Sequence, residues 1–483
     1  MKFRLFTLMI AVAFMPSLAR ADVKPHALCS EGMVLQQKSK AKVWGTAEAG
    51  EAVTVTFRDS KATTKADDSK NWVVEIETGT AGGPFELTIA GKNTIAYKNV
   101  LVGEVWVCSG QSNMEWSVNS CDKTDKEYAT SAPHNPMLRM FSVKKSPQAT
   151  PQADTAGTWT DAMPKTVGGF SATGYFFGRH LQETMKVPVG LIHTSWGGTR
   201  IETWMSKAAL AAAGVKEPTP DKPGANSASA LYNGMLHPIL NYTVKGATWY
   251  QGESNAGAGY KYRTLHNGMI ESWRNEFKNP NLAFHFVQLA PFTSVSPKPS
   301  ESSWAELREA QTLTLKLKNT GMAVITDFGN EYDIHPTPKR PVGERLALAA
   351  RATTYGEKIV FMGPLYQSVK FDGSKAVLTF DHVGGGLVGK ELVKTQERPK
   401  GGAAWRVKEG SSDGSPLVGF TVAGKDNVFH HAKAEIVGST VVVTSEAVAE
   451  PTAVRFGWAN HPVCNLFNRE GLPASPFRTD VPK

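Results

Sequence analysis

The sequence lacks the patterns that mark metal, nucleotide and nucleic-acid sites. Its four cysteines are too widely spaced to match a zinc site, and it contains no HExxH motif, phosphate-binding loop or dinucleotide fingerprint. The 53 Lys and Arg residues exceed the 44 Asp and Glu residues, but they form no basic run. These absences argue against a metal centre, a bound nucleotide and a nucleic-acid partner.

The shortage of cysteine also limits covalent cross-linking. Cys29, Cys108, Cys121 and Cys464 allow three complete disulfide pairings in an oxidising compartment. A bridge between Cys29 and Cys464 would tie the two ends of the chain together. Cys108 falls in an expected core strand, where a buried free thiol is at least as favourable. The sequence leaves the pairing open.

The chain has no apolar run long enough to span a bilayer. The longest, over residues 5–18, follows a positively charged start and is shorter than the roughly 18 residues of a spanning helix. Residues 19–21 (Ala-Arg-Ala) form a small-x-small cleavage site. We therefore predict a signal peptide over 1–21, cleavage near Ala21, and export to the bacterial periplasm or the exterior without stable membrane insertion.

Three regions of the sequence differ in the pattern of their apolar residues. Residues 22–100 carry short alternating apolar runs between turn clusters, which is typical of a small β-domain. Residues 101–358 alternate apolar strand candidates with helical patterns, and residues 359–483 return to a β-rich texture. This order predicts an α/β fold, with a three-layer α/β/α domain flanked by β-sandwich-type segments. Whether the two flanking segments associate in space is left open.

The central region predicts a parallel sheet with helices on both faces. The expected strands cover residues 104–108, 187–193, 246–250, 282–288 and 322–327. The expected helices cover residues 172–185, 260–277, 303–317 and 342–354. Ligands bind at the carboxyl ends of the strands in such sheets, so the residues that follow each strand are candidates for a site.

The first candidate segment is Gly110-Gln111-Ser112-Asn113, which follows strand 104–108. A serine at this point can face the crevice and can offer its own backbone N–H to an oxyanion. By itself, a polar turn that closes a strand explains the segment equally well. Gln111 is a candidate either for substrate binding or for bracing the loop.

Two further segments offer hydrogen-bond donors. Gly197 and Gly198 follow the second strand, and paired glycines can present a backbone N–H to a ligand or simply form a tight turn. Asn255 follows the third strand and could donate its side-chain amide to a developing oxyanion. Its neighbours Gln251 and Glu253 could bind substrate or brace the loop.

The segment Asp333-Ile334-His335-Pro336 supplies a candidate base. A histidine that serves a serine nucleophile needs an acceptor on its second ring nitrogen. Residues i and i+2 of an extended stretch project to the same side, so Asp333 could orient His335. Asp333 could instead cap the next helix, and Asp327, at the end of its strand, is a rival orienter. Together the four segments predict acyl transfer by a serine nucleophile.

Five segments carry a resemblance to a known family. They are 110–116 (GQSNMEW), 196–199 (WGGT), 251–255 (QGESN), 333–336 (DIHP) and 343–347 (GERLA). In combination they resemble the sialate O-acetylesterases, which belong to the SGNH hydrolases, over nearly the whole mature chain. The resemblance implies an SGNH (flavodoxin-like) domain that hydrolyses O-acetyl esters on a sugar or polysaccharide without a metal or organic cofactor.

The resemblance also assigns roles to residues. Ser112 would be the nucleophile, His335 the general base and Asp333 its orienter. The oxyanion hole would combine the Ser112 backbone, a glycine of the 197–198 pair and Asn255. Many SGNH enzymes place the aspartate three residues before the histidine, whereas the separation here is two.

Alternative functions follow from the same resemblance. Related bacterial enzymes deacetylate plant polysaccharides, so an acetylesterase of hemicellulose or pectin is the alternative substrate assignment. A secreted carbohydrate-binding protein without catalysis is a second class of function. The presence of every expected catalytic element argues against that class, because a degenerate binder should have lost at least one.

Overall fold

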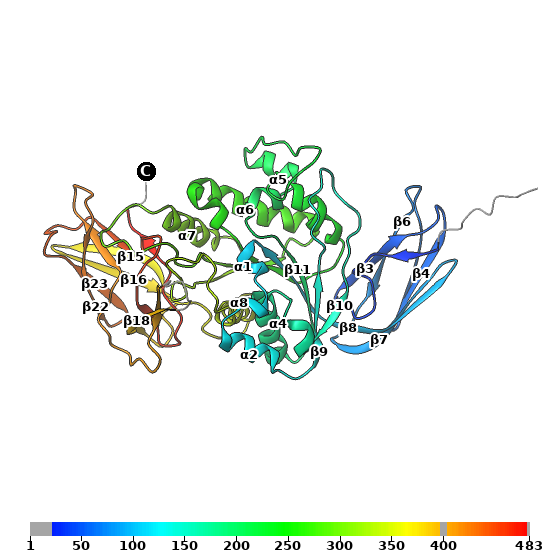
Figure 1. The fold of residues 1–483 in the computed structure, drawn as a ribbon, viewed down its shortest axis with the longest axis horizontal. Helices are drawn as coiled ribbons and strands as arrows, with labels where there is room; N and C mark the ends of the chain where they lie inside the picture. Colours follow the sequence, from blue (N-terminus) through cyan, green and yellow to red (C-terminus); the bar gives the residue numbers. More distant parts are fainter. Residues whose placement is uncertain (1–21, 397–402, 481–483) are drawn as a thin grey trace, which may run out of the picture.

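The computed structural model describes residues 22–396 and 403–480, which form an elongated molecule with a mixed α/β centre and β-rich ends (Figure 1). The N-terminal strands lie at one end and the C-terminal strands at the other. The two flanking β-regions therefore do not associate in space, which resolves a question that the sequence left open. The predicted signal segment, 1–21, lies outside the described residues. Among the described residues, no helix is both long enough and apolar enough to cross a membrane.

The N-terminal region is built mainly from antiparallel strands, with one parallel pair between β2 and β8, and several of its strands alternate buried and exposed positions. Strand β6 shows this alternation over its full length, because every second side chain faces the core. Its strands are β1 (Lys24–Pro25), β2 (Val34–Gln36), β3 (Lys40–Thr46), β4 (Ala52–Phe57), β5 (Ser60–Lys65), β6 (Asn71–Glu77), β7 (Gly82–Ala90) and β8 (Thr94–Gly110).

Strand β8 belongs to two regions at once. Its first half pairs antiparallel with β7, and its second half pairs in parallel with β11 and β12 of the central sheet. It thus crosses residue 100, where the sequence analysis placed a domain boundary. The division of the chain into domains stays a prediction, but a boundary at residue 100 would cut through one continuous strand.

The central sheet has the strand order β10-β9-β11-β8-β12-β13-β14. All neighbours from β9 to β14 are parallel, whereas β10 is antiparallel to β9, so the sheet is mixed rather than wholly parallel as predicted. The remaining central strands are β9 (Asn135–Ser142), β10 (Trp159–Ala162), β11 (Val189–Ser195), β12 (Gly246–Tyr250), β13 (Ala283–Val287) and β14 (Thr320–Ala323).

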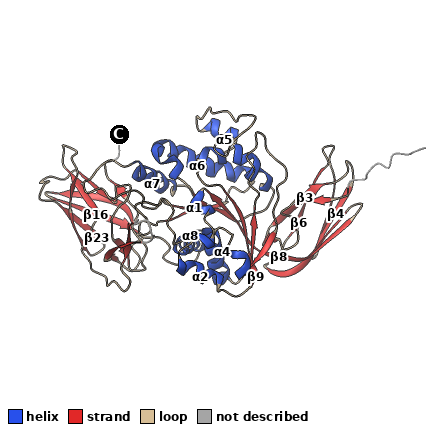
Figure 2. Ribbon diagram, viewed as in Figure 1, coloured by secondary structure: helices blue, strands red, loops and turns tan. Residues whose placement is uncertain are grey.

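Helices cover both faces of this sheet (Figure 2). Along β8, Val105 and Val107 contribute to the core under α6, while Trp106 and Cys108 contribute to the core under α4 and α8. This period of two divides the apolar side chains between two faces, as expected for a strand buried on both sides. The helices are α1 (Ser112–Glu115), α2 (Lys123–Thr130), α3 (Pro164–Val167), α4 (Ala172–Met185), α5 (Lys207–Ala212), α6 (Gly259–Glu276), α7 (Ser303–Thr314) and α8 (Arg340–Thr353).

The C-terminal region contains two four-stranded sheets, β15-β16-β23-β22 and β21-β20-β24-β26. Apolar side chains from both sheets form one shared core. Its strands are β15 (Leu365–Asp372), β16 (Lys375–Asp381), β17 (Leu387–Gly389), β18 (Leu392–Gln396), β19 (Ala403–Val407), β20 (Phe420–Ala423), β21 (His430–His431), β22 (Lys433–Val437), β23 (Thr440–Thr444), β24 (Ala453–Phe456), β25 (Leu466–Asn468) and β26 (Phe477–Arg478).

All four cysteines are free thiols. Cys29 packs in the core that the N-terminal region shares with the central sheet. Cys464 packs in the core of the C-terminal region, at the other end of the molecule. The bridge between Cys29 and Cys464 that the sequence allowed is therefore wrong. Cys108 is fully buried on β8, in agreement with the free thiol expected there.

The buried cation Arg308, on α7, joins the central and C-terminal regions. Its guanidinium donates to the carbonyls of Leu289 and Ala290, just beyond β13, at 2.7 and 3.0 Å. It also donates to the carbonyls of Ala459 and Asn460, in the C-terminal region, at 2.7 and 2.9 Å. Burial lowers the pKa of Arg308 to about 9, which is the cost of placing a charge at this junction.

We predict that Arg308→Met weakens the junction between the two regions. The substitution keeps much of the side-chain volume but removes the donors of four main-chain carbonyls, and each buried group left without a partner costs about 1–3 kcal/mol. Urea unfolding should show a loss of about 3 kcal/mol or more. Arg469→Met, at an exposed position, is the control and should change stability by less than about 0.5 kcal/mol. An unchanged unfolding midpoint for Arg308→Met would contradict the assignment.

Candidate active site

A tight turn carries the chain from β8 into the candidate nucleophile. Gly110 ends β8 with φ of 142°, and a Cβ at this position would lie 2.1 Å from the carbonyl oxygen of Tyr250. Glycine is therefore required both by conformation and by the close approach of β12. The next residue, Gln111, donates its N–H to the same carbonyl at 2.9 Å. Ser112 then begins α1 at the carboxyl edge of the sheet.

Ser112 is half-buried, and its backbone N–H is available at the start of α1. The carbonyl of Gln111 accepts from the N–H groups of Met114 and Glu115 at 3.0 and 2.9 Å. The Ser112 N–H has no acceptor among the described residues, as is usual for the first donor of a helix. It is thus free to bind an anion that approaches the Ser112 hydroxyl.

The glycine pair after β11 lies beside Ser112, but its two amides differ. A Cβ on Gly197 would be 3.3 Å from the Cβ of Ser112. The Gly197 N–H already donates to Oε2 of Glu115 at 2.6 Å. Gly198 has φ of 73° and is exposed, and its N–H has no acceptor within the described part of the chain. Of the two candidates, Gly198 has the amide that remains available.

Asn255 lies on the short 3-10 helix η5 (Glu253–Ala258), which follows β12. Its Oδ1 accepts from the N–H of Ile201 at 3.0 Å and from Nε2 of Gln251 at 2.7 Å. Its Nδ2 donates to Oε2 of Glu202 at 3.0 Å. These three bonds fix the orientation of the amide and leave one of its two N–H groups without an acceptor among the described residues.

The two candidate glutamines brace the loops. Gln251 is fully buried and, besides its bond to Asn255, donates to the carbonyl of Thr199 at 3.1 Å. Gln111 is 2% exposed, and its Oε1 accepts from the N–H groups of Gly252 and Ser254 at 3.3 Å each. With so little exposed surface, neither side chain is placed to contact a substrate.

The structure brings Asp333, rather than Asp327, to His335. Oδ1 of Asp333 lies 3.2 Å from Nδ1 of His335 and accepts from the His335 backbone N–H at 2.9 Å. Asp327 instead forms a buried two-bond ion pair with Arg345, at 2.7 and 2.6 Å. The alternative role of Asp333 as a helix cap is wrong, because Asp125 accepts from the N–H groups at the start of α8.

Three residues without an assigned role lie in the same site. Asn113 and Lys339 are both fully buried, and Nζ of Lys339 donates to Oδ1 of Asn113 at 2.5 Å. Nδ2 of Asn113 donates to Oε1 of Glu253 at 2.6 Å, so Glu253 also braces the site. Trp116 stacks on the ring of His335, with centroids 4.9 Å apart. The contact between Asn113 and Lys339 spans 226 positions, and no local pattern in the sequence marks it.

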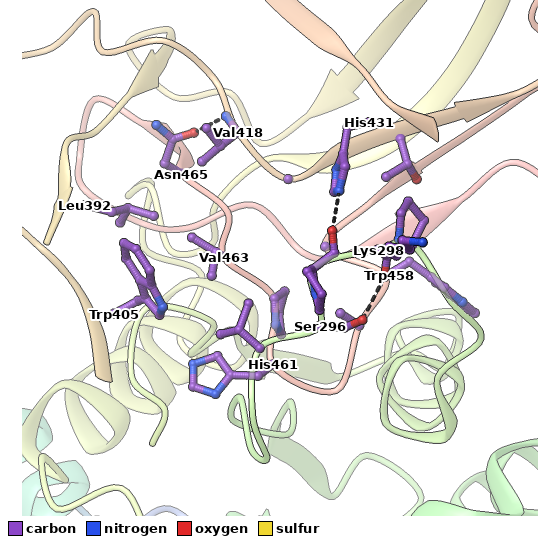
Figure 3. Close-up of a pocket in the computed structure, with 18 of the residues that line it drawn as sticks. Ser296, Lys298, Leu392, Trp405, Val418, His431, Trp458, His461, Val463 and Asn465 are labelled. Atoms are coloured by element: carbon purple, nitrogen blue, oxygen red, sulfur yellow. Dashed lines mark hydrogen bonds between the residues drawn. The ribbon is translucent and has the colours of Figure 1, made fainter. Parts of the chain in front are cut away.

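A separate cleft of about 810 Å³ lies between residues 295–300 and the C-terminal region (Figure 3). None of the candidate site residues lines it. The side chain of His431 joins the two regions, because its Nε2 lies 3.1 Å from the carbonyl of Pro297, while Asn465 accepts from the N–H of Val418 at 2.8 Å within the C-terminal region. The cleft is therefore a joint between two regions and not the site defined by the strand ends.

Within residues 22–396 and 403–480, no group of three His, Cys, Asp or Glu side chains is arranged to hold a metal ion. What the strand ends do bring together is a serine, a carboxylate-bound histidine and several amide donors. These are the groups that acyl transfer requires.

Comparison with known proteins agrees with this chemistry. Residues 102–352 match a family described as carbohydrate esterase, sialic acid-specific acetylesterase. The chain is 35% identical over 396 residues to the sialate O-acetylesterases of Homo sapiens and Pongo abelii, covering 72% of this chain and 75% of each relative. The crystal structure of a carbohydrate acetylesterase from Xanthomonas citri is similar with a TM-score of 0.85 and 41% identity, over 95% of this chain and 100% of that one.

The chain is thus a carboxylic-ester hydrolase with an α/β fold. It belongs to the sialic acid-specific acetylesterase family of carbohydrate esterases.

Proposed function

We propose that this protein is an exported O-acetylesterase that removes acetyl groups from sugars through a Ser-His-Asp acyl-enzyme mechanism on an SGNH-type domain over 101–358. The observation that carries the proposal is the contact between Asp333 and Nδ1 of His335. This contact leaves Nε2 as the ring nitrogen that can take a proton from the nucleophile. Ser112 is the nucleophile, and its neighbour Asn113 donates to the carbonyl of Ile334 at 3.1 Å, which ties the two loops together.

The substrate class rests on the relatives. The human and Pongo abelii proteins are sialate O-acetylesterases, and the Xanthomonas citri protein is a carbohydrate acetylesterase. These names support an O-acetylated sugar as the substrate of this chain, with O-acetylated sialic acid as the particular substrate. No observation on this chain favours a plant polysaccharide over it.

The proposed reaction uses the serine, the histidine and the aspartate already described. Oγ of Ser112 attacks the acetyl carbonyl as His335 removes its proton, which forms a tetrahedral oxyanion. His335 then returns the proton to the sugar oxygen as the ester bond breaks. Water attacks the acetyl carbonyl on Ser112 as His335 takes its proton, His335 then gives that proton to Oγ as the bond between Oγ and the acyl carbon breaks, and acetic acid leaves and ionises in water. Asp333 keeps the His335 ring in one tautomer throughout the cycle.

Three amide groups are proposed to bind the oxyanion. They are the N–H of Ser112, the N–H of Gly198 and the remaining N–H of Asn255. The Gly197 N–H is not included because Glu115 already accepts it at 2.6 Å. In enzymes with such a site, removal of one donor raises the barrier by about 2.7–4 kcal/mol.

The first test is acetate release by the wild type and by Ser112→Ala. The wild type should release acetate from 9-O-acetylated sialic acid, and Ser112→Ala should lose about 10⁴-fold or more in kcat because the acyl-enzyme cannot form. Ser368→Ala, at an exposed position on β15, is the matched control and should retain full activity. Equal rates for wild type and Ser112→Ala would exclude the serine mechanism. Turnover of acetylated xylan without turnover of the sialic acid would overturn the substrate assignment.

Asp333→Asn and Asp327→Asn should have opposite effects. Asp333→Asn leaves the fold intact but stabilises the wrong tautomer of His335, so kcat should fall by about 10²- to 10⁴-fold. Asp327→Asn disrupts the buried pair with Arg345 and should lower the free energy of unfolding by about 3–5 kcal/mol, with kcat of the folded enzyme nearly unchanged. Kinetics and urea unfolding of both variants measure this, and the reverse pattern would rule out Asp333 as the orienter.

Export can be tested by the mass of the mature protein. When the full chain is expressed in a bacterial host, intact-mass spectrometry of the periplasmic fraction should detect residues 22–483. Ala21→Lys removes the small residue before the cleavage point and should leave the precursor uncleaved. An exported protein that still carries residues 1–21 would contradict the proposal.

A further inference from the structure

Three segments of the active site meet at the side chain of Asn113, namely α1, η5 and the loop that leads into α8. This residue follows Ser112 on α1 and is fully buried. Its Nδ2 donates to Oε1 of Glu253, on η5, at 2.6 Å and to the carbonyl of Ile334 at 3.1 Å. Its Oδ1 accepts from Nζ of Lys339, which directly precedes α8, at 2.5 Å.

The chemistry of these partners permits one orientation of the Asn113 amide. An ammonium group only donates hydrogen bonds, whereas a carboxylate and a main-chain carbonyl only accept them. A flipped amide would place Nδ2 against the Lys339 ammonium and Oδ1 against the Glu253 carboxylate. Both contacts would be repulsive in a buried site, so Lys339 and Glu253 together fix the amide, and the ammonium holds its oxygen.

The backbone of Lys339 is held independently of its side chain. Oδ2 of Asp125 accepts from the N–H groups of Lys339 and Arg340 at 2.7 and 2.8 Å, which satisfies the first donors of α8. Nζ also lies 5.7 Å from the centre of the Trp116 ring, the same ring that stacks on His335. One cation thus contacts the neighbour of the nucleophile and the ring that supports the base.

We propose that the protonated side chain of Lys339 is a positioning residue, which aligns Ser112 with His335 through Asn113 and Trp116. This inference rests on the proposed function, because it assumes that Ser112 and His335 react together. Lys339 acts through its neighbours and not on the acetyl group. Its role is to hold the nucleophile and the base in one relative orientation while the acyl group is transferred.

The proposal predicts a pH dependence on the alkaline side. Burial lowers the pKa of Lys339 to about 8, so its ammonium is present below that pH and is lost above it. A neutral amine is a weaker donor than an ammonium, so loss of the charge weakens the bond that holds Oδ1 of Asn113, while Glu253 and the Ile334 carbonyl still set which way the amide points. kcat should therefore fall as the pH rises through about 8. The titratable side chains that face Nζ from the surrounding elements are Cys121, Asp125, Tyr250, Glu253 and Asp333.

The first experiment compares Lys339→Met and Lys339→Arg with the wild type. Loss of a buried hydrogen bond from a charged donor should lower kcat of Lys339→Met by about 10- to 100-fold, with KM within about twofold. Its kcat should no longer fall near pH 8. Lys339→Arg keeps the charge, because an arginine does not titrate in this range, so it should recover part of kcat and move the fall to higher pH. The control is Lys370→Met, at an exposed position on β15.

A double-variant cycle then tests whether Lys339 acts through Asn113. If it does, Asn113→Ala combined with Lys339→Met should have the kcat of Asn113→Ala alone, within about threefold. Losses that multiply would overturn this route. Lys339→Met with wild-type kcat and an unaltered pH profile, whatever its unfolding midpoint, would overturn the proposal as a whole.

A second single variant covers the case in which Lys339→Met does not fold. Asn113→Asp keeps an acceptor for Lys339 but cannot donate to Glu253 or to Ile334, so kcat should fall at least about tenfold in a folded protein. Wild-type kcat for this variant would overturn the proposal. The Ser112→Ala variant separates the two possible failures. If the serine mechanism is wrong, Ser112→Ala stays active. If only the role of Lys339 is wrong, Ser112→Ala is inactive while the Lys339 and Asn113 variants keep wild-type kcat.

Discussion

The parallel pairing of β8 with β11 and β12 is the constraint on which the rest of the site depends. In this register Gly110 lies opposite both Ser195 and Tyr250, so the three strands end at the same level. The loops that follow them therefore begin side by side, although they are far apart in the sequence. Close contact between Gly110 and the Tyr250 carbonyl leaves no room for a side chain, and this keeps the turn toward Ser112 tight.

The buried polar side chains behind Ser112 hold the carboxyl edge of the sheet in one geometry, and their burial lowers the stability of the fold. Asn113 and Lys339 are fully buried, burial lowers the pKa of Lys339, and burial raises the pKa of Glu253. Such groups are tolerated only when they are bonded to one another, and a bonded network has one geometry. Arg308 follows the same principle at the junction with the C-terminal region, where a single buried cation binds carbonyls from both sides.

Periodicity in the sequence predicted the elements that are strongly patterned. Strand β12 and helix α4 have the predicted bounds, because an apolar strand buried on both faces and a helical stripe are local signals. Strand β9 was missed because it contains Pro136 and the charged Arg139, whose buried guanidinium is paired with Asp161 and bonded to Asn99 and to the Pro136 carbonyl. The choice between Asp333 and Asp327 depends on Arg345, a long-range partner, and so could not be read from spacing. Spacing also could not show that the Gly197 N–H already donates to Glu115, or that Lys339 reaches Asn113.

Strand β8 also has a mechanical consequence. Its 17 residues form one uninterrupted strand, which would measure roughly 55 Å if fully extended. It pairs with the N-terminal sheet over its first half and with the central sheet over its second half. No loop separates its two halves, although its register with β7 shifts between Tyr97 and Val100. A load on the N-terminal region would pull on the central strands in shear and would reach the turn that carries Ser112 without a flexible joint between them.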